Sequence, residues 1–217
     1  MDYQATKHGS NFNLRAFCSD VLIYSLGQAI LLAFGFIQSL IIPKYLSTAD
    51  FGYWQLFLLY TSYVGILHLG FLNGILIRWA GKNLEDFKKE VPLAFRYTLL
   101  EQGVVIGTLV FFIIGFVGFP AKEIMLLVLA NAIVVNLLMF FVITIQATKR
   151  FKLITTANIG KGLLFLIVTL VIFLGGYHSY FLLVLATMIA GLIIVFLFAF
   201  HLRDSLFYHQ DLEESLF

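Results

Sequence analysis

Three ionisable side chains lie within or at the end of long apolar runs of this 217-residue sequence, namely Arg78, Glu101 and Lys161. A charge at bilayer depth costs at least about 3 kcal/mol, so such groups usually face a protein interior or a water-filled cavity. Two cations and one carboxylate at similar depth predict an inward-facing vestibule that attracts an anionic head group such as a pyrophosphate. Other interpretations stay open, because Arg78 and Lys161 can extend to the lipid head groups. Glu101 can instead form a structural ion pair with Arg78 or Arg96.

Four asparagines add neutral hydrogen-bonding groups to the same apolar runs. Their amides can bind the hydroxyls of a sugar, yet amides also tie neighbouring helices together in lipid. Asn158 and Lys161 are three residues apart, which places them on one face of a helix. The candidates for lining a substrate cavity are therefore the three ionisable residues and four asparagines. The asparagines are Asn73, Asn131, Asn136 and Asn158.

Motifs of enzymes and cofactor sites do not occur in the sequence. There is no paired-cysteine metal site, no HExxH, no phosphate-binding glycine loop and no Gly-x-Ser-x-Gly elbow. We therefore expect a protein that is not an enzyme and has no catalytic residue, cofactor or metal. The formal net charge is only +2, and basic and aromatic residues do not alternate, so nothing favours a nucleic-acid partner.

The composition is that of an integral membrane protein. Hydrophobic residues make up 61% of the chain and charged residues only 12%, whereas about 25% is usual in soluble domains. About 20 consecutive apolar residues suffice to cross the hydrocarbon layer as a helix. The sequence contains six such runs, which predict an all-α polytopic membrane protein with spans at about 21–42, 51–77, 97–119, 124–148, 153–177 and 179–200.

Three parts of the chain follow from these spans. Residues 1–19 form a cytoplasmic segment whose scattered apolar positions suit a short helix on the membrane surface. Residues 20–200 form a lobe of six transmembrane helices. Residues 201–217 form an amphipathic cytoplasmic tail, which we interpret as the start of a connector to a further part of the protein.

The distribution of Lys and Arg predicts the orientation, since these residues are enriched in cytoplasmic loops. With the N-terminus inside, the outer turns hold only Lys44 and Lys122. The cytoplasmic flanks hold the other twelve, and both termini are then cytoplasmic. The twelve are Lys7, Arg15, Arg78, Lys82, Lys88, Lys89, Arg96, Lys149, Arg150, Lys152, Lys161 and Arg203.

Residues 20–82 resemble the N-terminal region of polysaccharide transporters, the O-antigen flippases of the Wzx type. The pattern consists of a glycine-containing first helix, a proline turn, an acidic-Phe-Gly step and a second helix ending near Leu-Gly-Phe and an arginine. The matching positions here are Gly27, 43–46, 50–52, 69–71 and Arg78. No single element of the pattern is specific, whereas the combination is moderately so.

The resemblance implies a fold of the multidrug, oligosaccharidyl-lipid and polysaccharide exporter superfamily, in which two six-helix lobes enclose a cavity. It implies transport of an undecaprenyl-pyrophosphate-linked oligosaccharide across the bacterial cytoplasmic (inner) membrane, for lipopolysaccharide or other surface polysaccharides. Basic cavity residues are thought to hold the pyrophosphate and sugar in that family, which makes Arg78 and Lys161 candidates. Membrane lipids are the remaining partner.

Six spans correspond to only one lobe of such a transporter, and alternating access needs two. We therefore expect a truncated or split protein that lacks its C-terminal half, or else a homodimer of two six-helix lobes. Two other functions remain: a non-transporting scaffold subunit of a polysaccharide assembly complex, and a multidrug exporter of the same superfamily. The multidrug reading is weakened because Glu101 is the only carboxylate deep in an apolar run.

Overall fold

The computed structural model describes residues 14–207, with the backbone alone for residues 14–21. Every regular element in this range is helical. Apolar runs in lipid must satisfy their backbone hydrogen bonds internally, which a helix does. The elements are α1 (Leu14–Tyr45), α2 (Thr48–Ser62), the 3₁₀ helix η1 (Val64–His68), α3 (Phe71–Trp79), α4 (Leu84–Phe87), α5 (Val91–Phe116), α6 (Ala121–Ala147), α7 (Phe151–Leu174), α8 (Tyr180–His201) and α9 (Arg203–Leu206).

The expected all-helical architecture is confirmed, and its long helices are compatible with a polytopic membrane protein. Five helices are long and apolar enough to cross a membrane, and a sixth candidate is a bent pair. The five are α5, α6, α7, α8 and the Leu22–Tyr45 part of α1. The predicted surface helix of residues 1–19 falls partly on α1, and its first 13 residues lie outside the described range. Most of the predicted tail, residues 208–217, also lies outside it.

The second predicted span, residues 51–77, is not one straight helix. Thr48–His68 and Phe71–Trp79 are bent by 61° relative to each other. Between them, Leu69 and Gly70 have φ angles of 45° and 84°, which an α-helix does not allow. His68 Nδ1 accepts a hydrogen bond of 3.2 Å from the Gly70 amide, so the bend is tied by a local contact.

Boundaries of other spans also differ from the sequence prediction. Pro43 was expected to end the first span, but α1 includes it and continues to Tyr45. The third span was expected to begin near residue 97, but α5 begins at Val91 with a proline in its first turn. Proline fits a first helical turn because the backbone amide there has no helical partner. Arg96 does not delay the helix, since its side chain is exposed.

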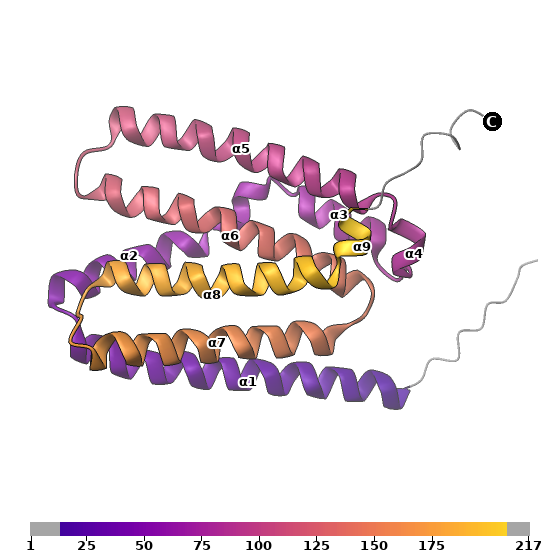
Figure 1. The fold of residues 1–217 in the computed structure, drawn as a ribbon, viewed down its shortest axis with the longest axis horizontal. Coiled ribbons are helices and arrows are strands. Elements are labelled where there is room, and N and C mark those ends of the chain that lie inside the picture. Colours follow the sequence, from indigo (N-terminus) through magenta and orange to yellow (C-terminus); the bar gives the residue numbers. More distant parts are fainter. Residues whose placement is uncertain (1–13, 208–217) are drawn as a thin grey trace, which may run out of the picture.

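The long helices lie side by side in the order α1, α7, α8, α6, α5, with α2 crossing α6 and α8 (Figure 1). Chain neighbours are therefore not always spatial neighbours. The helix against which α1 mainly packs is α7, and α3 packs on α6. We call the end of the molecule that holds α4 and α9 the α4 end. The helices α1, α5 and α7 start there, and α3, α6 and α8 finish there.

Close helix approaches depend on three glycines. A Cβ at Gly162 of α7 would lie 2.8 Å from the Phe34 ring of α1, and one at Gly27 of α1 would collide with Thr155. On the other side of α8, a Cβ at Gly191 would lie 2.7 Å from Val134 of α6. Helix pairs in lipid gain from such small residues because their backbones can approach.

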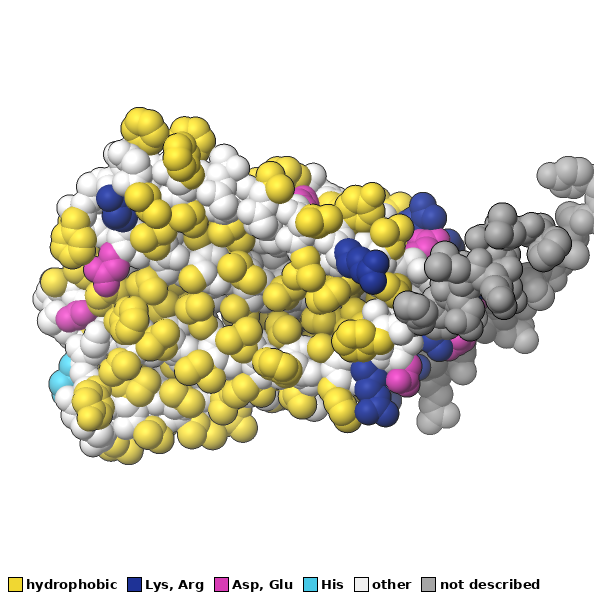
Figure 2. Space-filling view, turned by 45° about the horizontal axis from the view of Figure 1, so that its top comes forward, with side chains coloured by type: hydrophobic (Ala, Val, Ile, Leu, Met, Phe, Trp, Pro, Cys, Tyr) yellow, Lys and Arg dark blue, Asp and Glu magenta, His cyan; other side chains and the backbone are white. Residues whose placement is uncertain are grey.

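The surface matches a membrane-embedded chain. Figure 2 shows hydrophobic side chains along the length of the visible face, with charged side chains mainly toward its two ends. Inside, one buried apolar cluster lies toward the α4 end and includes Trp79, Phe87 and Phe140. A second cluster lies toward the opposite end and includes Trp54 and Phe57.

Candidate substrate cavity

A cavity of about 670 Å³ lies between α1, α2, α7 and α8. Its apolar walls include Phe34, Trp54 and Phe165. Its polar lining comes from all four helices: Gln28, Gln38 and Ser39 of α1, Gln55 of α2, Asn158 and Lys161 of α7, and Thr187 of α8. Two of the seven sequence-based candidates, Asn158 and Lys161, therefore lie in one cavity.

The hydroxyl groups of this lining are already engaged. Ser39 donates to the carbonyl oxygen of Phe36 at 2.7 Å, and Thr187 donates to that of Leu183 at 2.9 Å. Such bonds to the preceding turn satisfy hydroxyls within their own helix. They leave the amides and the ammonium group as the free functional groups of the cavity.

Among the side chains that the structure describes, those of residues 22–207, none forms a hydrogen bond or ion pair with Lys161, Asn158 or the three glutamines. Unsatisfied amides and ammonium groups are costly in an apolar environment. A polar ligand or water must therefore supply their partners when the protein lies in a membrane.

Lys161 lies deeper than its sequence position suggested. The expected span began near residue 153, which put Lys161 about two turns inside. Helix α7 begins at Phe151, so Lys161 is ten residues, or about 15 Å, along a 24-residue helix. This is close to the middle of the span, where reaching the lipid head groups is harder for a lysine.

The charge of the cavity determines which ligands it suits. Among the described residues that line the cavity, Lys161 is the one ionisable residue, and none is Asp or Glu. An ammonium donates up to three hydrogen bonds, and each amide offers donors and acceptors. Together they suit a ligand with an anionic group and several hydroxyls, and they disfavour a cation.

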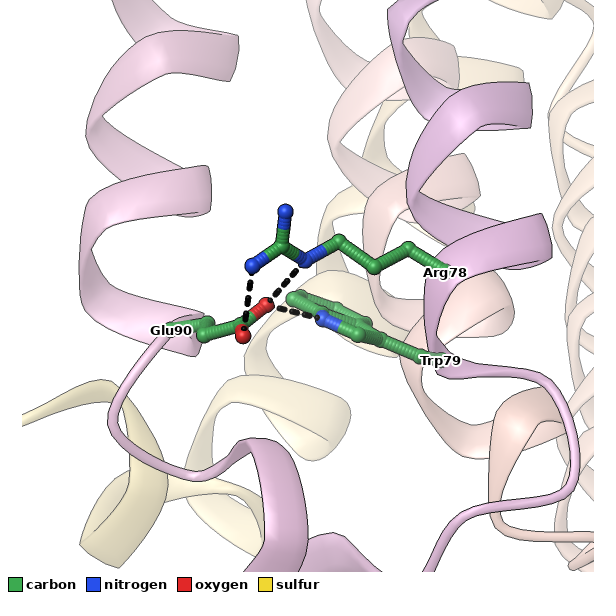
Figure 3. Close-up of polar contacts among 3 residues, drawn as sticks. All are labelled: Arg78, Trp79 and Glu90. Atoms are coloured by element: carbon green, nitrogen blue, oxygen red, sulfur yellow. Dashed lines mark hydrogen bonds and ion pairs between the residues drawn. The ribbon is translucent and has the colours of Figure 1, made fainter.

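Arg78 lies elsewhere, at the α4 end, in a contact that the sequence did not predict. Its guanidinium donates two hydrogen bonds to Glu90, from Nε at 2.8 Å and from a terminal nitrogen at 2.9 Å (Figure 3). The indole of Trp79 donates a third, 2.9 Å long, to the same carboxylate. The pKa of Glu90 is lowered, mainly by the hydrogen bond from Arg78 and then by that from Trp79. The ion-pair partner of Arg78 is therefore Glu90. The alternative of an ion pair between Arg78 and Glu101 is wrong.

Glu101 is not near Lys161 either. It belongs to α5, ten residues after Val91, and α5 packs on α6, η1, α3 and α9 at the far side of the row from α1. One oxygen of its carboxylate is buried and has no hydrogen-bond partner among the described residues, and the carboxylate interacts electrostatically with the buried His68 of η1. The structure therefore does not bring Arg78, Glu101 and Lys161 into one vestibule.

The other three asparagines have different environments. Asn136 of α6 is fully buried and donates a 3.0 Å hydrogen bond to Gln102 of α5, so it ties two helices together. Asn131 is also buried in α6, and its amide nitrogen has no partner. Asn73 is exposed on α3. None of the three lines the cavity.

Sequence reasoning missed the glutamines of the cavity. Gln28 and Gln38 are the two notable polar interruptions of the first apolar run, and Gln55 similarly interrupts the second. That isolation in an apolar run was the available signal. What the sequence lacked was the packing of α1 on α7, which brings these amides next to Lys161.

Outside comparisons leave the family of the chain open. No family model, no curated protein and no solved structure was found to match it. Within the described residues, no group of three or more His, Cys, Asp or Glu is arranged to hold a metal ion. The fold shows an all-helical chain whose five to six long apolar helices are compatible with a multi-pass membrane protein.

Proposed function

We propose that the chain is one lobe of a transporter that flips undecaprenyl-pyrophosphate-linked oligosaccharide across the bacterial cytoplasmic membrane. The observation that carries this proposal is the cavity of α1, α2, α7 and α8. It combines one lysine near the middle of α7 with free amides, and no carboxylate is found among the described residues that line it. Lys161 would contact the pyrophosphate, and Asn158 and the glutamines would contact the sugars.

The orientation of the lobe follows from the positive charges of the described residues. Lys44 and Lys122 lie at the end opposite to α4. The α4 end carries nine Lys and Arg, which favours the cytoplasm as its location. These are Arg78, Lys82, Lys88, Lys89, Arg96, Lys149, Arg150, Lys152 and Arg203.

A second six-helix lobe would complete the transport path, since alternating access needs two repeats around a shared site. It would come from a further part of the protein or from a second copy. Native mass of the detergent-solubilised chain distinguishes these sources, because a monomer would exclude the homodimer. A cationic drug is disfavoured as the substrate, because the cavity offers it no carboxylate.

Complementation of a flippase-deficient strain tests the proposal. The gene containing this chain should restore surface glycan, and Lys161→Met should abolish most of that activity at equal protein level. Arg96→Gln is the matched control, since it removes one exposed cation outside the cavity. Full transport by Lys161→Met would refute the role of the cavity. Failure to restore glycan, with glycan chain length still dependent on the protein, would instead favour a scaffold subunit.

A further inference from the structure

A second cavity lies at the α4 end, between α7 and α8, and has a volume of about 570 Å³. It is separate from the cavity of Lys161, and the two share no lining residue. We call this second cavity the α7–α8 groove.

The walls of the groove are two matching apolar stripes. Helix α7 contributes Leu153, Ala157 and Gly160, and α8 contributes Ile194, Leu197 and Phe198. Spacings of three and four residues put each set on one helix face. The α7 stripe extends from Leu153 to Gly160, a distance of about 10 Å along the helix axis. A Cβ at Gly160 would meet no atom within 4 Å, so the groove is open at that point.

The mouth of the groove is basic. His201 and Arg203 line it, and Arg150 from the α6–α7 turn contacts His201 at 3.2 Å. Because a guanidinium can only donate hydrogen bonds, the Nε2 atom of His201 is the acceptor. Arg203 lies over the Phe200 ring at 5.0 Å. Arg150 and Arg203 are both exposed, so most of their N–H donors remain open to a ligand.

One acidic residue also lines the mouth. Asp204 lies 3.4 Å from Arg203, and the exposed side chains of this pair are 60% and 84% accessible for Arg203 and Asp204. Lys149 and Lys152 stand beside Arg150 in the chain and are exposed too. Four Lys and Arg therefore oppose one carboxylate, and the local charge is positive.

A phospholipid matches the two parts of this site. Its acyl chain suits the apolar groove, and its phosphate suits the basic mouth at the helix end. An acyl chain has apolar surroundings both in the bilayer and in the groove. The groove alone therefore distinguishes poorly between one lipid and another. Selection must come from the head group, since basic residues at a membrane surface attract anionic lipids. We propose that the α7–α8 groove binds an anionic phospholipid, with an acyl chain between the two stripes and the phosphate held by Arg150 and Arg203.

Lipid titration monitored by native mass spectrometry tests this site on the full chain. Phosphatidylglycerol should bind more tightly than phosphatidylcholine. Arg150→Gln and Arg203→Gln should each lower phosphatidylglycerol affinity about fivefold and lower phosphatidylcholine affinity less, because choline offsets the charge of its phosphate. Arg96→Gln, an exposed cation on α5 outside the groove, is the matched control and should change neither. Equal affinity for the two lipids, or unchanged phosphatidylglycerol affinity in both arginine variants, would overturn the proposal.

Two further measurements distinguish the contribution of the apolar groove to lipid binding from that of the head-group contact. Gly160→Leu should fill the groove and lower the affinity for both lipids, while helix content stays unchanged. Inorganic phosphate should not compete with phosphatidylglycerol at comparable concentration, because it lacks the acyl chain. Competition by free phosphate, or tight phosphatidylglycerol binding by a folded Gly160→Leu variant, would show that the groove is not the site.

Discussion

Replacing Glu90 tests whether one carboxylate joins the end of α3 to the start of α5. Glu90 immediately precedes α5 and accepts hydrogen bonds from Arg78 and Trp79, the last two residues of α3. The two donors differ in burial. The Arg78 side chain is 68% exposed, whereas Trp79 is only 1% exposed.

The difference in burial between the two donors determines how much stability each substitution should cost. An exposed ion pair contributes about 0.2–1 kcal/mol. A buried donor that loses its partner costs about 1–3 kcal/mol. Arg78→Ala should therefore lower the free energy of unfolding only slightly, because its side chain is 68% exposed. Glu90→Ala should lower it by about 1–4 kcal/mol, because the Trp79 indole N–H then stays buried and unpaired. Glu90→Gln should fall between them, since its amide oxygen can still accept from Trp79.

Unfolding in mixed detergent, followed by helix content, measures these differences. The order of destabilisation should be Glu90→Ala, then Glu90→Gln, then Arg78→Ala. Equal losses for Glu90→Ala and Arg78→Ala would refute the reasoning, because the buried Trp79 contact would then contribute nothing. A double variant of Arg78 and Glu90 gives the coupling energy of the ion pair alone.

The same variants predict a pH dependence. The pKa of Glu90 is lower in the folded protein than in the unfolded chain, where a glutamate has a pKa of about 4.3. The ionised carboxylate therefore stabilises the fold fully above that value, and this contribution is lost as pH falls through the folded-state pKa. The stability difference between the native chain and Glu90→Gln should be constant from about pH 6 to 8 and shrink below about pH 4.

Three other substitutions test the helix contacts. Asn136→Ala leaves Gln102 without its partner in the α5–α6 contact and should cost about 0.6–1.7 kcal/mol in an unfolding titration, whereas replacing both residues by Leu should cost less. Gly162→Val should separate α7 from α1 and lower the unfolding midpoint, whereas Gly103→Ala should not, because a Cβ at Gly103 meets open space. Gly70→Ala, at a φ of 84°, should destabilise the chain by about 1–2 kcal/mol, and a result near zero would mean that the bend can relax.

The all-helical class and the approximate extent of five of the six predicted spans could be read from the sequence. Apolar runs of this length have few alternatives in lipid, because their backbone groups must bond within the segment. The bend after His68 could not be read in the same way. Hydropathy does not change at Leu69 and Gly70, and the two positive φ angles depend on how η1 and α3 pack on α6 and α5.

The candidate site was predicted only in part. The position of a residue along its helix depends on where that helix starts, and its neighbours in space depend on how the helices pack. Asn158 and Lys161 share a helix face, so local spacing was enough to group them. Arg78 was grouped with Glu101 because each lies within or at the end of an apolar run, and no local spacing links Arg78 to Glu90 twelve residues later. In the structure a capping box at Asn83 starts α4, and the following turn brings Glu90 to Arg78.

The packing of α1 on α7 also has a consequence for synthesis of the protein. Gly27 and Thr155 touch in the folded chain but are 155 − 27 = 128 residues apart in sequence. At about 5–20 residues per second, α1 precedes its partner by about 6–26 s. During that interval the amides of Gln28 and Gln38 face lipid, or an insertion factor, without the wall that α7 later supplies. Cross-linking of stalled chains should join positions 27 and 155 only after α7 has left the ribosome, and an insertase should contact α1 until then.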